Sequence, residues 1–564
     1  MWSMKTSAGV IIALWICILI YLYTLLYGIQ GRSVETDDKL SEKLIEALES
    51  LQELRKQNSE LKLLIENERL ENVQRSNKDR ELLFSKLQID GKSNDVGEKP
   101  KSNDGLFSKD HEVVRRHVER NVWEIFYFLH SQFKKNPDSA ALFGNHTENQ
   151  LITLLASSQN LSFVDNADVW RTNELQKMTK KIQNAIERIQ NPDDCSQTRA
   201  LICGLDKECG FGCQLHHVAY CFLTAFGTGR TLVLKDNGVK WRYSRKGWNA
   251  VFQPVTKCDY KTVVGKDPIG NFEMNAQSRV VSLGIVDGMV NKPPFLPLSF
   301  PRQLADDLLK LHSNPPVYFV SQFIWYLMRG NEKMNAALNA TKEQIGFDKG
   351  PIVGIQVRRT DKIGTEASFH SVEEYMEWVD IWFRVTERRM GRKLKRRVYI
   401  ASDDPQVLPE AKKNYPKYEV FGDISIANTA QVNQRYTDSS LFGVITDIEL
   451  LSECDYLVCT FSSQVCRMGF ELMQIRKGDT GDSFHSLDDL YYYGGQYPHE
   501  QIIVEDYFPR RTEELELRAG DVVGIAGNHW DGFSKGQNRR TGKTGLYPSY
   551  KAIENWRIVD FPEI

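Results

Sequence analysis

The hydrophobic positions of the N-terminal region begin with one long apolar run. Residues 9–27 contain no charged side chain and are mostly Ile, Leu, Val, Trp and Tyr. Such a run is long enough to cross a bilayer as one helix, and the residues just after it lack the small-x-small pattern of a signal-peptide cleavage site. We therefore predict an uncleaved signal anchor at 9–27 rather than a cleaved signal peptide. Lys5, and the acidic residues that follow Arg32, favour a cytoplasmic tail at 1–8 and a lumenal body.

Residues 28–106 have the pattern of an extended stem. Within 40–68, apolar residues recur at alternating steps of four and three, with the polar Asn58 in the seam. This spacing is typical of a coiled coil through which the chain would self-associate, although a solvated single helix is the alternative. Residues 76–106 are rich in Lys, Asp, Ser, Asn and Gly, and we interpret them as a flexible linker.

From residue 107 onward the pattern is that of a folded body. Residues 107–194 return to a helical period, with charges between the apolar positions, and predict a helical region. Residues 195–345 combine a glycine-containing loop, an apolar helix and a strand at 231–234. This loop, helix and strand fit the N-terminal part of an α/β catalytic body.

Three strand-like runs organise the following segment, 346–500. They cover residues 352–357, 398–401 and 456–460, with helical patterns between them, and predict a parallel, Rossmann-type donor-binding sheet. Each run ends in polar residues, and the carboxyl ends of parallel strands meet at one edge of a sheet. The polar residues are Arg358 and Arg359, then Ser402, Asp403 and Asp404, then Ser462, Ser463 and Gln464. We expect them to converge on one crevice.

The last residues, 501–564, resemble an SH3 domain. The resemblance rests on the segments 514–521 and 545–550 and on Trp530, which matches the second of two SH3 tryptophans. His529 stands where an aromatic residue usually holds a polyproline ligand, and the opening motif is altered as well. These departures argue against ordinary PxxP binding and favour a small β-barrel that shapes an acceptor site.

Size and charge narrow the possible partners. A chain of 564 residues is long enough for three or four domains. Its 72 basic and 74 acidic side chains leave a formal charge of −2, which gives no general attraction to nucleic acid. We therefore expect no nucleic-acid partner, and any phosphate ligand must be held by local groups.

Cysteine usage distinguishes disulfides from metal sites. Six cysteines fall within 195–258, and Cys459 and Cys466 form a second local pair. Zinc is the alternative, but none of these spacings is the Cys-x-x-Cys of strong zinc sites, so we expect disulfides. Cys454 is left over and is predicted to be buried.

The polar strand ends offer the parts of a sugar-nucleotide transferase. Such an enzyme needs cations or a metal for the leaving diphosphate and a carboxylate that deprotonates the acceptor hydroxyl. Arg358 can bind a diphosphate bidentately, and the helix predicted after Ser463 can add backbone N–H groups. The sequence contains no Asp-x-Asp triplet, so we expect no metal. The alternative for the adjacent arginines is an ordinary solvated strand end.

Four segments together resemble the α-1,6-fucosyltransferase family. They are Val-Arg-Arg-Thr-Asp-Lys-Ile-Gly-Thr-Glu-Ala at 357–367, Gly-Phe-Gly-Cys-Gln-Leu-His-His at 210–217, Cys-Thr-Phe-Ser-Ser-Gln-Val-Cys-Arg at 459–467, and the terminal SH3. The resemblance covers nearly the whole chain. It implies a GT-B-like α/β enzyme, located as a single-pass type II protein of the Golgi membrane. Its reaction would be metal-independent, inverting transfer of fucose from GDP-fucose to the innermost GlcNAc of N-glycans.

The resemblance assigns roles residue by residue. Glu366 would be the general base for the 6-hydroxyl of GlcNAc, and Arg358 would grip the diphosphate in a donor loop that includes Lys362. The other donor-site positions are Arg359, Asp361, Tyr243, Asp403, Asp404, Asp447, Ser463 and Gln464. The acceptor-site positions are Lys207, Asp287, Asp488, Asp489 and His529.

Three further implications concern single positions and pairs. Asp447 would contact the guanine edge of the donor. Gln356 stands where the family usually has a histidine, and a glutamine can donate a hydrogen bond but cannot become cationic. The implied disulfides, among which spacing alone could not choose, are Cys195–Cys258, Cys203–Cys221, Cys209–Cys213 and Cys459–Cys466.

Two alternative functions stay open at this stage. One is a fucosyltransferase that acts on another acceptor, such as protein hydroxyls or chitin oligomers. The other is a membrane-tethered adaptor in which an inactive sugar-nucleotide fold presents the SH3 domain. The 357–367 motif and the altered SH3 ligand positions favour the core fucosyltransferase. Its expected partners are GDP-fucose, glycoprotein N-glycans, the membrane and a second copy of the chain, bound through the stem and helical region.

Overall fold

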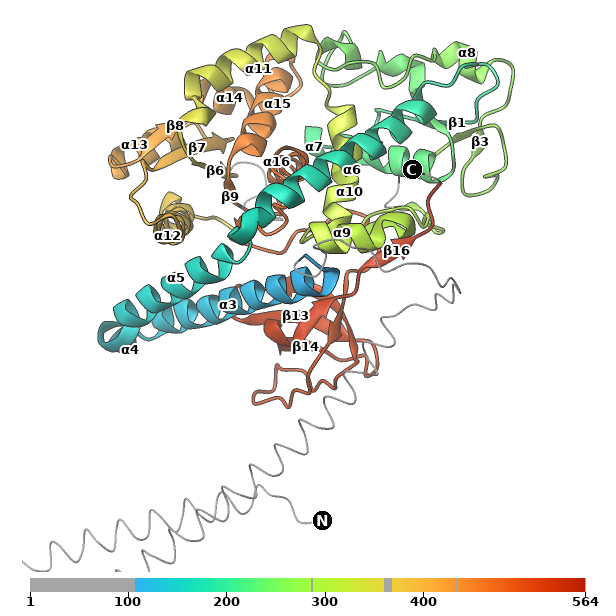
Figure 1. Ribbon diagram of the computed structural model, residues 1–564. Coiled ribbons are helices and arrows are strands. Elements are labelled where there is room, and N and C mark those ends of the chain that lie inside the picture. The colour runs from blue at the N-terminus through green and yellow to red at the C-terminus, as the bar shows by residue number, and fades with distance from the viewer. Residues whose placement is uncertain (1–106, 286–287, 360–367, 432–433, 563) are drawn as a thin grey trace, which may run out of the picture. The chain divides into compact units, whose positions relative to one another are not determined.

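The computed structural model describes residues 107–564 except 286–287, 360–367, 432–433 and 563 (Figure 1). The predicted signal anchor, coiled coil and linker therefore lie outside the described residues. All described residues belong to one compact unit, Pro100–Ile564. They confirm the predicted fold class, an α/β body with a Rossmann-type parallel sheet and a small SH3-like barrel, whereas the domain boundaries stay predictions.

The predicted location in the Golgi membrane needs correction. Among the described residues, no helix is long and apolar enough to cross a bilayer. The apolar helix α10 (Pro315–Leu327) has 13 residues and is therefore only about 20 Å long, short of the roughly 30 Å hydrocarbon core. The longest helix, α3 (Lys109–Lys135), carries charged residues along its length. The candidate span at 9–27 lies outside the described residues.

Helices form the N-terminal part of the described chain. α3 begins after Ser108, whose hydroxyl accepts a hydrogen bond from the His111 amide at 3.1 Å. The chain then turns through α4 (Pro137–Ser139) and η1 (Ala140–Gly144) into α5 (Asn145–Asn160), which packs back against α3. A short η2 (Val164–Asn166) leads into α6 (Ala167–Gln190).

The first α/β half contains a four-stranded parallel sheet. Its strands are β1 (Ala200–Cys203), β2 (Thr231–Leu234), β3 (Gly270–Asn271) and β4 (Val280–Ser282), in the order β2-β1-β4-β3. The apolar helix α7 (Phe211–Gly227) joins β1 to β2 and is buried along almost all of its length. The strand predicted at 231–234 and its preceding helix are thus confirmed.

Smaller elements complete this half and connect it to the next. They are η3 (Lys235–Gly238), η4 (Trp248–Ala250), α8 (Tyr260–Val264), β5 (Ser299–Pro301), η6 (Arg302–Leu304), α9 (Ala305–Leu311), α10, α11 (Glu332–Ile345) and η7 (Phe347–Lys349). The helix α10 packs against both α7 and α16 (Gln464–Arg476) of the second half.

The second half contains a five-stranded parallel sheet. Its strands are β6 (Ile352–Val357), β7 (Arg397–Ser402), β8 (Glu419–Phe421), β9 (Tyr456–Cys459) and β10 (Phe484–Ser486), in the order β10-β9-β6-β7-β8. The three predicted strands are confirmed. The sequence analysis missed β8 and β10, because these three-residue strands are too short to show an apolar pattern.

Helices cover both faces of this sheet. One face packs on α12 (Val372–Met390) and α13 (Val407–Asn414), and the other on α14 (Ile424–Thr429), α15 (Asp438–Glu453) and α16. Along β6, Val353 and Ile355 enter the core beneath α12, whereas Ile352 enters the core that continues into the first half. This core includes side chains of α7, α10, α15 and α16, so the two halves share one apolar interior.

The SH3-like barrel is antiparallel. Its strands are β11 (Glu500–Ile503), β12 (Val522–Asn528), β13 (Phe533–Asn538), β14 (Thr544–Pro548) and β15 (Ala552–Glu554), in the order β14-β13-β12-β11-β15, with η8 (Ser549–Lys551) before β15. After the barrel, β16 (Arg557–Val559) pairs in parallel with β5 of the first half.

The barrel lies against α3 (Figure 1). Gly532, with a φ of +87°, comes so close to this helix that an added Cβ would lie 2.9 Å from the Cβ of Phe128. The indole of Trp530 contacts the ring of Tyr127 edge-on, with 5.5 Å between centroids. Burial raises the pKa of Glu124, on the same helix, to about 7, although the nearby polar side chains of Ser549 and Asn528 in the barrel oppose this rise.

A buried ionic cluster fastens α3 to the second half. The carboxylate of Glu112 accepts hydrogen bonds from Arg115 at 3.1 Å and from Arg171 of α6 at 2.9 Å. Asp479, which follows α16, lies 3.5 Å from Arg116 and accepts a hydrogen bond from the Ser313 amide at 2.7 Å. Burial alone would raise the pKa of Asp479, but the positive charges around it, first Arg116, hold the pKa well below its usual range.

We predict that Asp479→Asn destabilises the protein by about 3 kcal/mol at pH 7, because buried guanidiniums lose an anionic partner. Since the folded-state pKa of Asp479 is depressed, its stabilisation is complete above about pH 5, begins to decline near the ordinary carboxyl pKa of about 4, and is lost as the pH falls through the lower folded-state pKa. The difference between wild type and variant, measured by urea unfolding, should therefore shrink between pH 7 and pH 3.

Asp306→Asn is the matched control, because the Asp306 side chain is 85% exposed and pairs with Lys109 at the surface. It should change the stability by less than about 1 kcal/mol. Equal losses for the two variants at pH 7 would contradict the importance of the buried cluster.

Candidate active site

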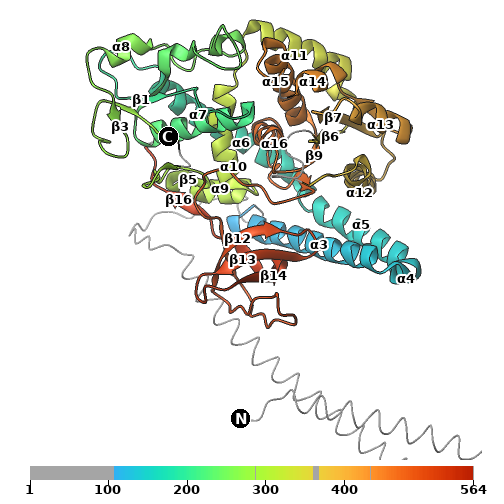
Figure 2. The same ribbon diagram turned by 180° about the vertical axis from the view of Figure 1, so that it is seen from behind.

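The crevice for a ligand lies where the direction of the second sheet reverses. The chain runs from β6 outward through β7 to β8 and then returns to β9 on the other side of β6. The strands β6, β7 and β9 lie side by side in both views (Figures 1 and 2). In such sheets, ligands bind beyond the carboxyl ends of the two strands at the reversal. Arg358 follows β6 there, and residues 460–463 follow β9.

The N-terminus of α16 faces this crevice with unusual polar groups. Ser463 is the N-cap residue and is fully buried, but its side chain makes no capping hydrogen bond. Within the described part of the chain, the hydroxyl oxygens of Ser462 and Ser463 are buried and have no hydrogen-bond partner. Two unpartnered hydroxyls beside the free N–H groups of a 13-residue helix form a site for an anion.

Asp488 holds the loop that carries these serines. Its carboxylate accepts hydrogen bonds from the Phe461 amide at 2.7 Å and the Ser462 amide at 3.1 Å. The hydroxyl of Ser486 donates to the same carboxylate at 2.8 Å. The sequence analysis places Asp488 on the acceptor rim, whereas in the structure its oxygens bind this loop, which turns the helix N-terminus toward the crevice.

The barrel reaches the same loop through Trp530. Its backbone adopts a φ of +51°, a conformation that is rare for residues other than glycine, and its amide donates to the Asn528 side chain at 2.7 Å. The indole Nε1 then donates to the carbonyl of Asp488 at 2.9 Å. The ring also contacts His485, which stacks on Trp378. Trp530 is thus partly buried, with its ring against these side chains.

The other arginine of the pair has internal partners. The amide of Arg359 donates to Asp403 at 2.8 Å, which joins the ends of β6 and β7. Its guanidinium lies 3.5 Å from Asp404 and 3.2 Å from Glu410 of α13. Asp403 and Asp404 thus hold Arg359, whose guanidinium pairs with acidic side chains of the protein. Arg358 is the arginine whose position suits a ligand.

Two predicted donor residues lie beneath the crevice. Gln356 on β6 is buried, and among the described residues its side-chain oxygen has no hydrogen-bond partner. Asp447 on α15 is also buried and accepts a hydrogen bond from the Tyr399 hydroxyl at 2.7 Å. Burial raises the pKa of Asp447 to about 7, because the charged form loses its hydration.

The first half contributes its side of the crevice. Lys207 lies in the loop after β1, partly exposed, and its carbonyl accepts a hydrogen bond from Gln214 of α7 at 2.6 Å. The hydroxyl of Tyr243 donates to the carbonyl of Cys209 at 3.1 Å, and its ring lies 5.1 Å from that of Tyr436. Burial raises the pKa of Tyr243.

The remaining predicted residues divide into two groups. Asp489 and the exposed His529 lie near the barrel, where the Asp489 carboxylate accepts a hydrogen bond from the Asn528 amide at 3.3 Å and burial raises its pKa. The predicted positions Asp287, Asp361, Lys362 and Glu366 lie outside the described residues.

The four disulfides of the described chain join the pairs that the resemblance implies. They are Cys195–Cys258, Cys203–Cys221, Cys209–Cys213 and Cys459–Cys466. The last one ties the end of β9 to the first turn of α16. Cys454 is a free, buried cysteine, as predicted.

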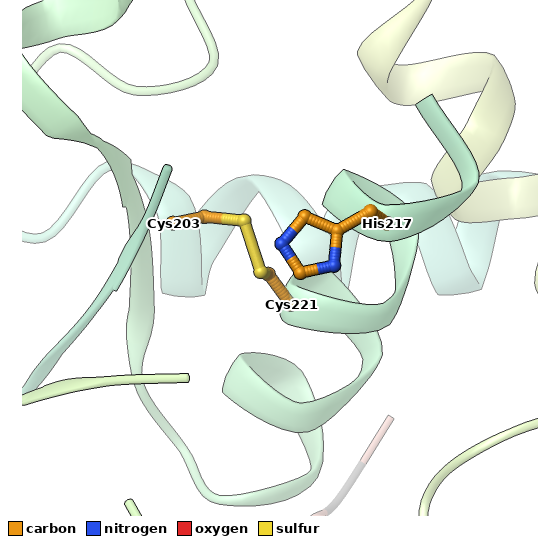
Figure 3. Close-up of side chains that lie close together, drawn as sticks. All are labelled: Cys203, His217 and Cys221. Atoms are coloured by element: carbon orange, nitrogen blue, oxygen red, sulfur yellow. A yellow bond between two sulfur atoms is a disulfide. The ribbon is translucent and has the colours of Figure 1, made fainter. Parts of the chain in front are cut away.

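One cluster in the described chain has the composition of a metal site. Cys203, His217 and Cys221 are buried, and their potential ligand atoms lie within 4.8 Å of one another (Figure 3). The two sulfurs are bonded to each other, so neither is available as a thiolate ligand. A lone imidazole does not hold a metal ion, and the cluster is a disulfide with a neighbouring histidine.

Sequence reasoning missed a group of buried residues at the junction of the two halves. The carboxylate of Glu471 is hydrogen-bonded there to His216 through one oxygen and to Tyr491 through the other. The only sequence signal was the His216-His217 dipeptide at the end of the 210–217 segment. A buried contact between residues that are far apart in the chain leaves no characteristic spacing in the sequence.

Comparisons with known proteins agree along nearly the whole chain. Residues 1–492 match the family of alpha-(1,6)-fucosyltransferase N- and catalytic domains, and residues 504–551 match a variant SH3 domain. An alpha-(1,6)-fucosyltransferase of Caenorhabditis elegans is 47% identical over 99% of both chains. One of Drosophila melanogaster is 39% identical over 96% of this chain and 95% of that one. A crystal structure of the fucosyltransferase NodZ from Bradyrhizobium is 17% identical and covers 48% of this chain and 92% of that one, with a TM-score of 0.29.

We predict that Asp488→Asn destabilises the protein by about 1.5–3 kcal/mol, because the amide nitrogen cannot accept the backbone hydrogen bonds that the carboxylate holds. The same change should weaken the binding of pyrophosphate, measured by calorimetry, because the N-terminus of α16 loses its orientation.

Asp482→Asn is a suitable control, since the Asp482 side chain is 45% exposed and lies 3.5 Å from Arg120. Its effect on stability should stay below about 1 kcal/mol. Unchanged stability and pyrophosphate affinity in Asp488→Asn would show that the loop does not depend on this carboxylate.

Proposed function

The chain belongs to the alpha-(1,6)-fucosyltransferase family and is a glycosyltransferase, and from this premise we propose its donor, acceptor and mechanism. The donor is GDP-fucose. The acceptor is the 6-hydroxyl of the innermost GlcNAc of N-glycans. The observation that carries the proposal is that Arg358 follows β6 while the serine hydroxyls without a partner among the described residues follow the neighbouring β9, at the reversal point of a parallel sheet.

The leaving diphosphate binds at this meeting point. The planar guanidinium of Arg358 matches two phosphate oxygens, and the hydroxyls and amides of residues 462–464 bind others. These groups stabilise the negative charge that develops on GDP as the glycosidic bond breaks. Charge stabilisation by the protein makes a metal unnecessary, and we propose that transfer is metal-independent.

The nucleoside extends along the crevice beneath β7. Tyr399 orients the carboxyl group of Asp447, and we assign this group to the guanine edge. The buried amide of Gln356 supplies a further donor contact, because its oxygen lacks a partner among the described residues. Tyr243 closes the site from the first half.

The acceptor GlcNAc lies between the donor and the first half. Lys207 and Asp287 orient it, and Asp489 with His529 forms the outer rim that contacts the rest of the glycan. Glu366 is the general base. It removes the proton of the 6-hydroxyl while that oxygen attacks the anomeric carbon of fucose, and the bond to the GDP oxygen breaks with inversion. Asp361 and Lys362 belong to the same donor loop.

The adaptor alternative receives no support from the barrel. Trp530, the tryptophan that the SH3 resemblance rests on, is partly buried and packs against Tyr127, Phe484 and His485. An aromatic side chain held in this way is not free to bind a proline-rich ligand. Activity toward another acceptor is the alternative that the transfer experiment below separates.

We also propose that the active form is a homodimer. Val114, Val118 and Ile125 lie on one face of α3 and are 58%, 43% and 48% exposed. An exposed apolar face on a long helix favours association through the helical region as well as the predicted stem.

Transfer of labelled fucose from GDP-fucose to a GlcNAc-terminated biantennary N-glycopeptide tests the proposed function directly. We expect product with full-length protein in the presence of EDTA. The label should stay on the innermost GlcNAc after the outer sugars are removed. Product on chitin oligomers or protein hydroxyls alone would overturn the acceptor assignment, and dependence on a divalent metal would overturn the mechanism.

Two substitutions should separate binding from chemistry. Arg358→Ala should weaken GDP binding and abolish transfer, because the diphosphate loses its guanidinium. Glu366→Gln should retain GDP binding but slow transfer by about 10²–10⁴, the usual cost of a missing general base. GDP calorimetry and initial rates measure the two effects, and normal transfer by either variant contradicts the proposed mechanism.

A further inference from the structure

His216 connects the two halves of the catalytic body at the donor side. It lies on α7, and its ring Nδ1 is hydrogen-bonded to the side-chain oxygen of Gln464, the first residue of α16. Its Nε2 is hydrogen-bonded at 2.9 Å to Glu471, two turns further along α16. Since both ring nitrogens are engaged by one helix, the imidazole fixes the side chain of Gln464 relative to the body of α16.

The two helices meet closely at this point. Gly212 lies in the first turn of α7, and an added Cβ would come within 2.6 Å of the Cβ of Gln464 and 3.2 Å of the sulfur of Met468. Gly212 is therefore required because α7 and α16 approach each other closely at this position, and not because its backbone adopts a left-handed conformation. The contact places the N-terminus of α7 directly beside the N-terminus of α16, and a shift of either helix would move the other.

The partners of His216 are themselves held in place. Glu471 is fully buried, and its second carboxylate oxygen accepts a hydrogen bond from the Tyr491 hydroxyl at 2.7 Å. The hydroxyl of Tyr493 donates to the carbonyl of His216 at 3.0 Å, and the two rings lie 4.5 Å apart. A buried carboxylate with these fixed partners is a rigid support, because an unsatisfied charge in this position is costly.

We infer that His216 is a positioning residue of the transfer reaction. It acts through Gln464 and so sets the first turn of α16, which binds the donor diphosphate. The inference rests on the proposed function for this turn. It also gives α7 a role in catalysis, because α7 follows the loop that carries the acceptor residue Lys207. Through His216, the acceptor half and the donor helix keep a constant distance.

His216→Phe tests this inference, because phenylalanine keeps the ring packing and removes both hydrogen bonds. We expect the KM for GDP-fucose to rise about tenfold and the KM for the glycan acceptor to stay unchanged. A tenfold change is the usual effect of losing a hydrogen bond to a charged or fixed group. His216→Gln, which can still reach one partner, should restore part of the donor affinity.

Tyr491→Phe is the matched control. It removes one hydrogen bond from the same carboxylate, whereas the hydrogen bond to the Gln464 side chain comes from His216. This variant should lower the melting temperature while its donor KM stays within about twofold of wild type. The opposite outcome is that both variants lower the melting temperature and reduce kcat, because less of the protein is active, while the donor KM stays unchanged. In that case His216 has only a structural role and the inference is overturned.

A double-mutant cycle gives the sharper test and does not depend on the stability of one variant. If His216 acts through Gln464, then Gln464→Ala and His216→Phe should not add, and the double variant should have the donor KM of the weaker single variant. Additive effects overturn the inference.

Arg358→Ala distinguishes this failure from a failure of the proposed function. Weaker GDP binding by Arg358→Ala, measured by calorimetry, together with an unchanged donor KM in His216→Phe overturns the role of His216 alone. Unchanged GDP binding by Arg358→Ala overturns the diphosphate site itself.

Discussion

The packing of α16 is the constraint on which the catalytic body depends. This helix lies against α15 in the second half and against α7 and α10 of the first, so both halves share its apolar side chains. Its N-terminus must also point into the crevice of the sheet with two buried hydroxyls unpartnered within the described chain. Burial of the helix body stabilises the fold, and the same burial keeps polar groups at its end ready for a charged ligand.

The loop before α16 keeps the N-terminus of this helix in position, and the contacts that hold it do not use the hydroxyls of Ser462 and Ser463. The carboxylate of Asp488 accepts hydrogen bonds from the amides of Phe461 and Ser462. The disulfide between Cys459 and Cys466 spans the turn. The indole of Trp530 donates a hydrogen bond to the carbonyl of Asp488. Support therefore comes from β10 and from the barrel. The SH3-like barrel thus supports the loop of the candidate site through a tryptophan that packs against the catalytic body.

The positions of several candidate site residues could be predicted because polar residues directly follow apolar strands. Arg358, Asp403 and Ser463 were found in this way, and the parallel sheet brings them to one edge. Their individual roles could not be predicted from position alone. Arg359 has the same local sequence signal as Arg358, but Asp404 and Glu410 neutralise it. Asp488 is a polar residue after a strand as well, and its carboxylate accepts hydrogen bonds from backbone amides, which its position in the sequence does not show.

The sequence by itself determined the elements whose information is local: the periods of helices and strands, the polar strand ends, and the motif resemblance that indicated the chemistry. Only the tertiary structure decided which of these groups meet. The contacts of His216 with Glu471, of Trp530 with Asp488, and of Asp479 with the arginines of α3 join segments far apart in the chain. A hydrogen bond between such segments depends on how the helices pack, and packing is set by the whole apolar interior rather than by any stretch of sequence.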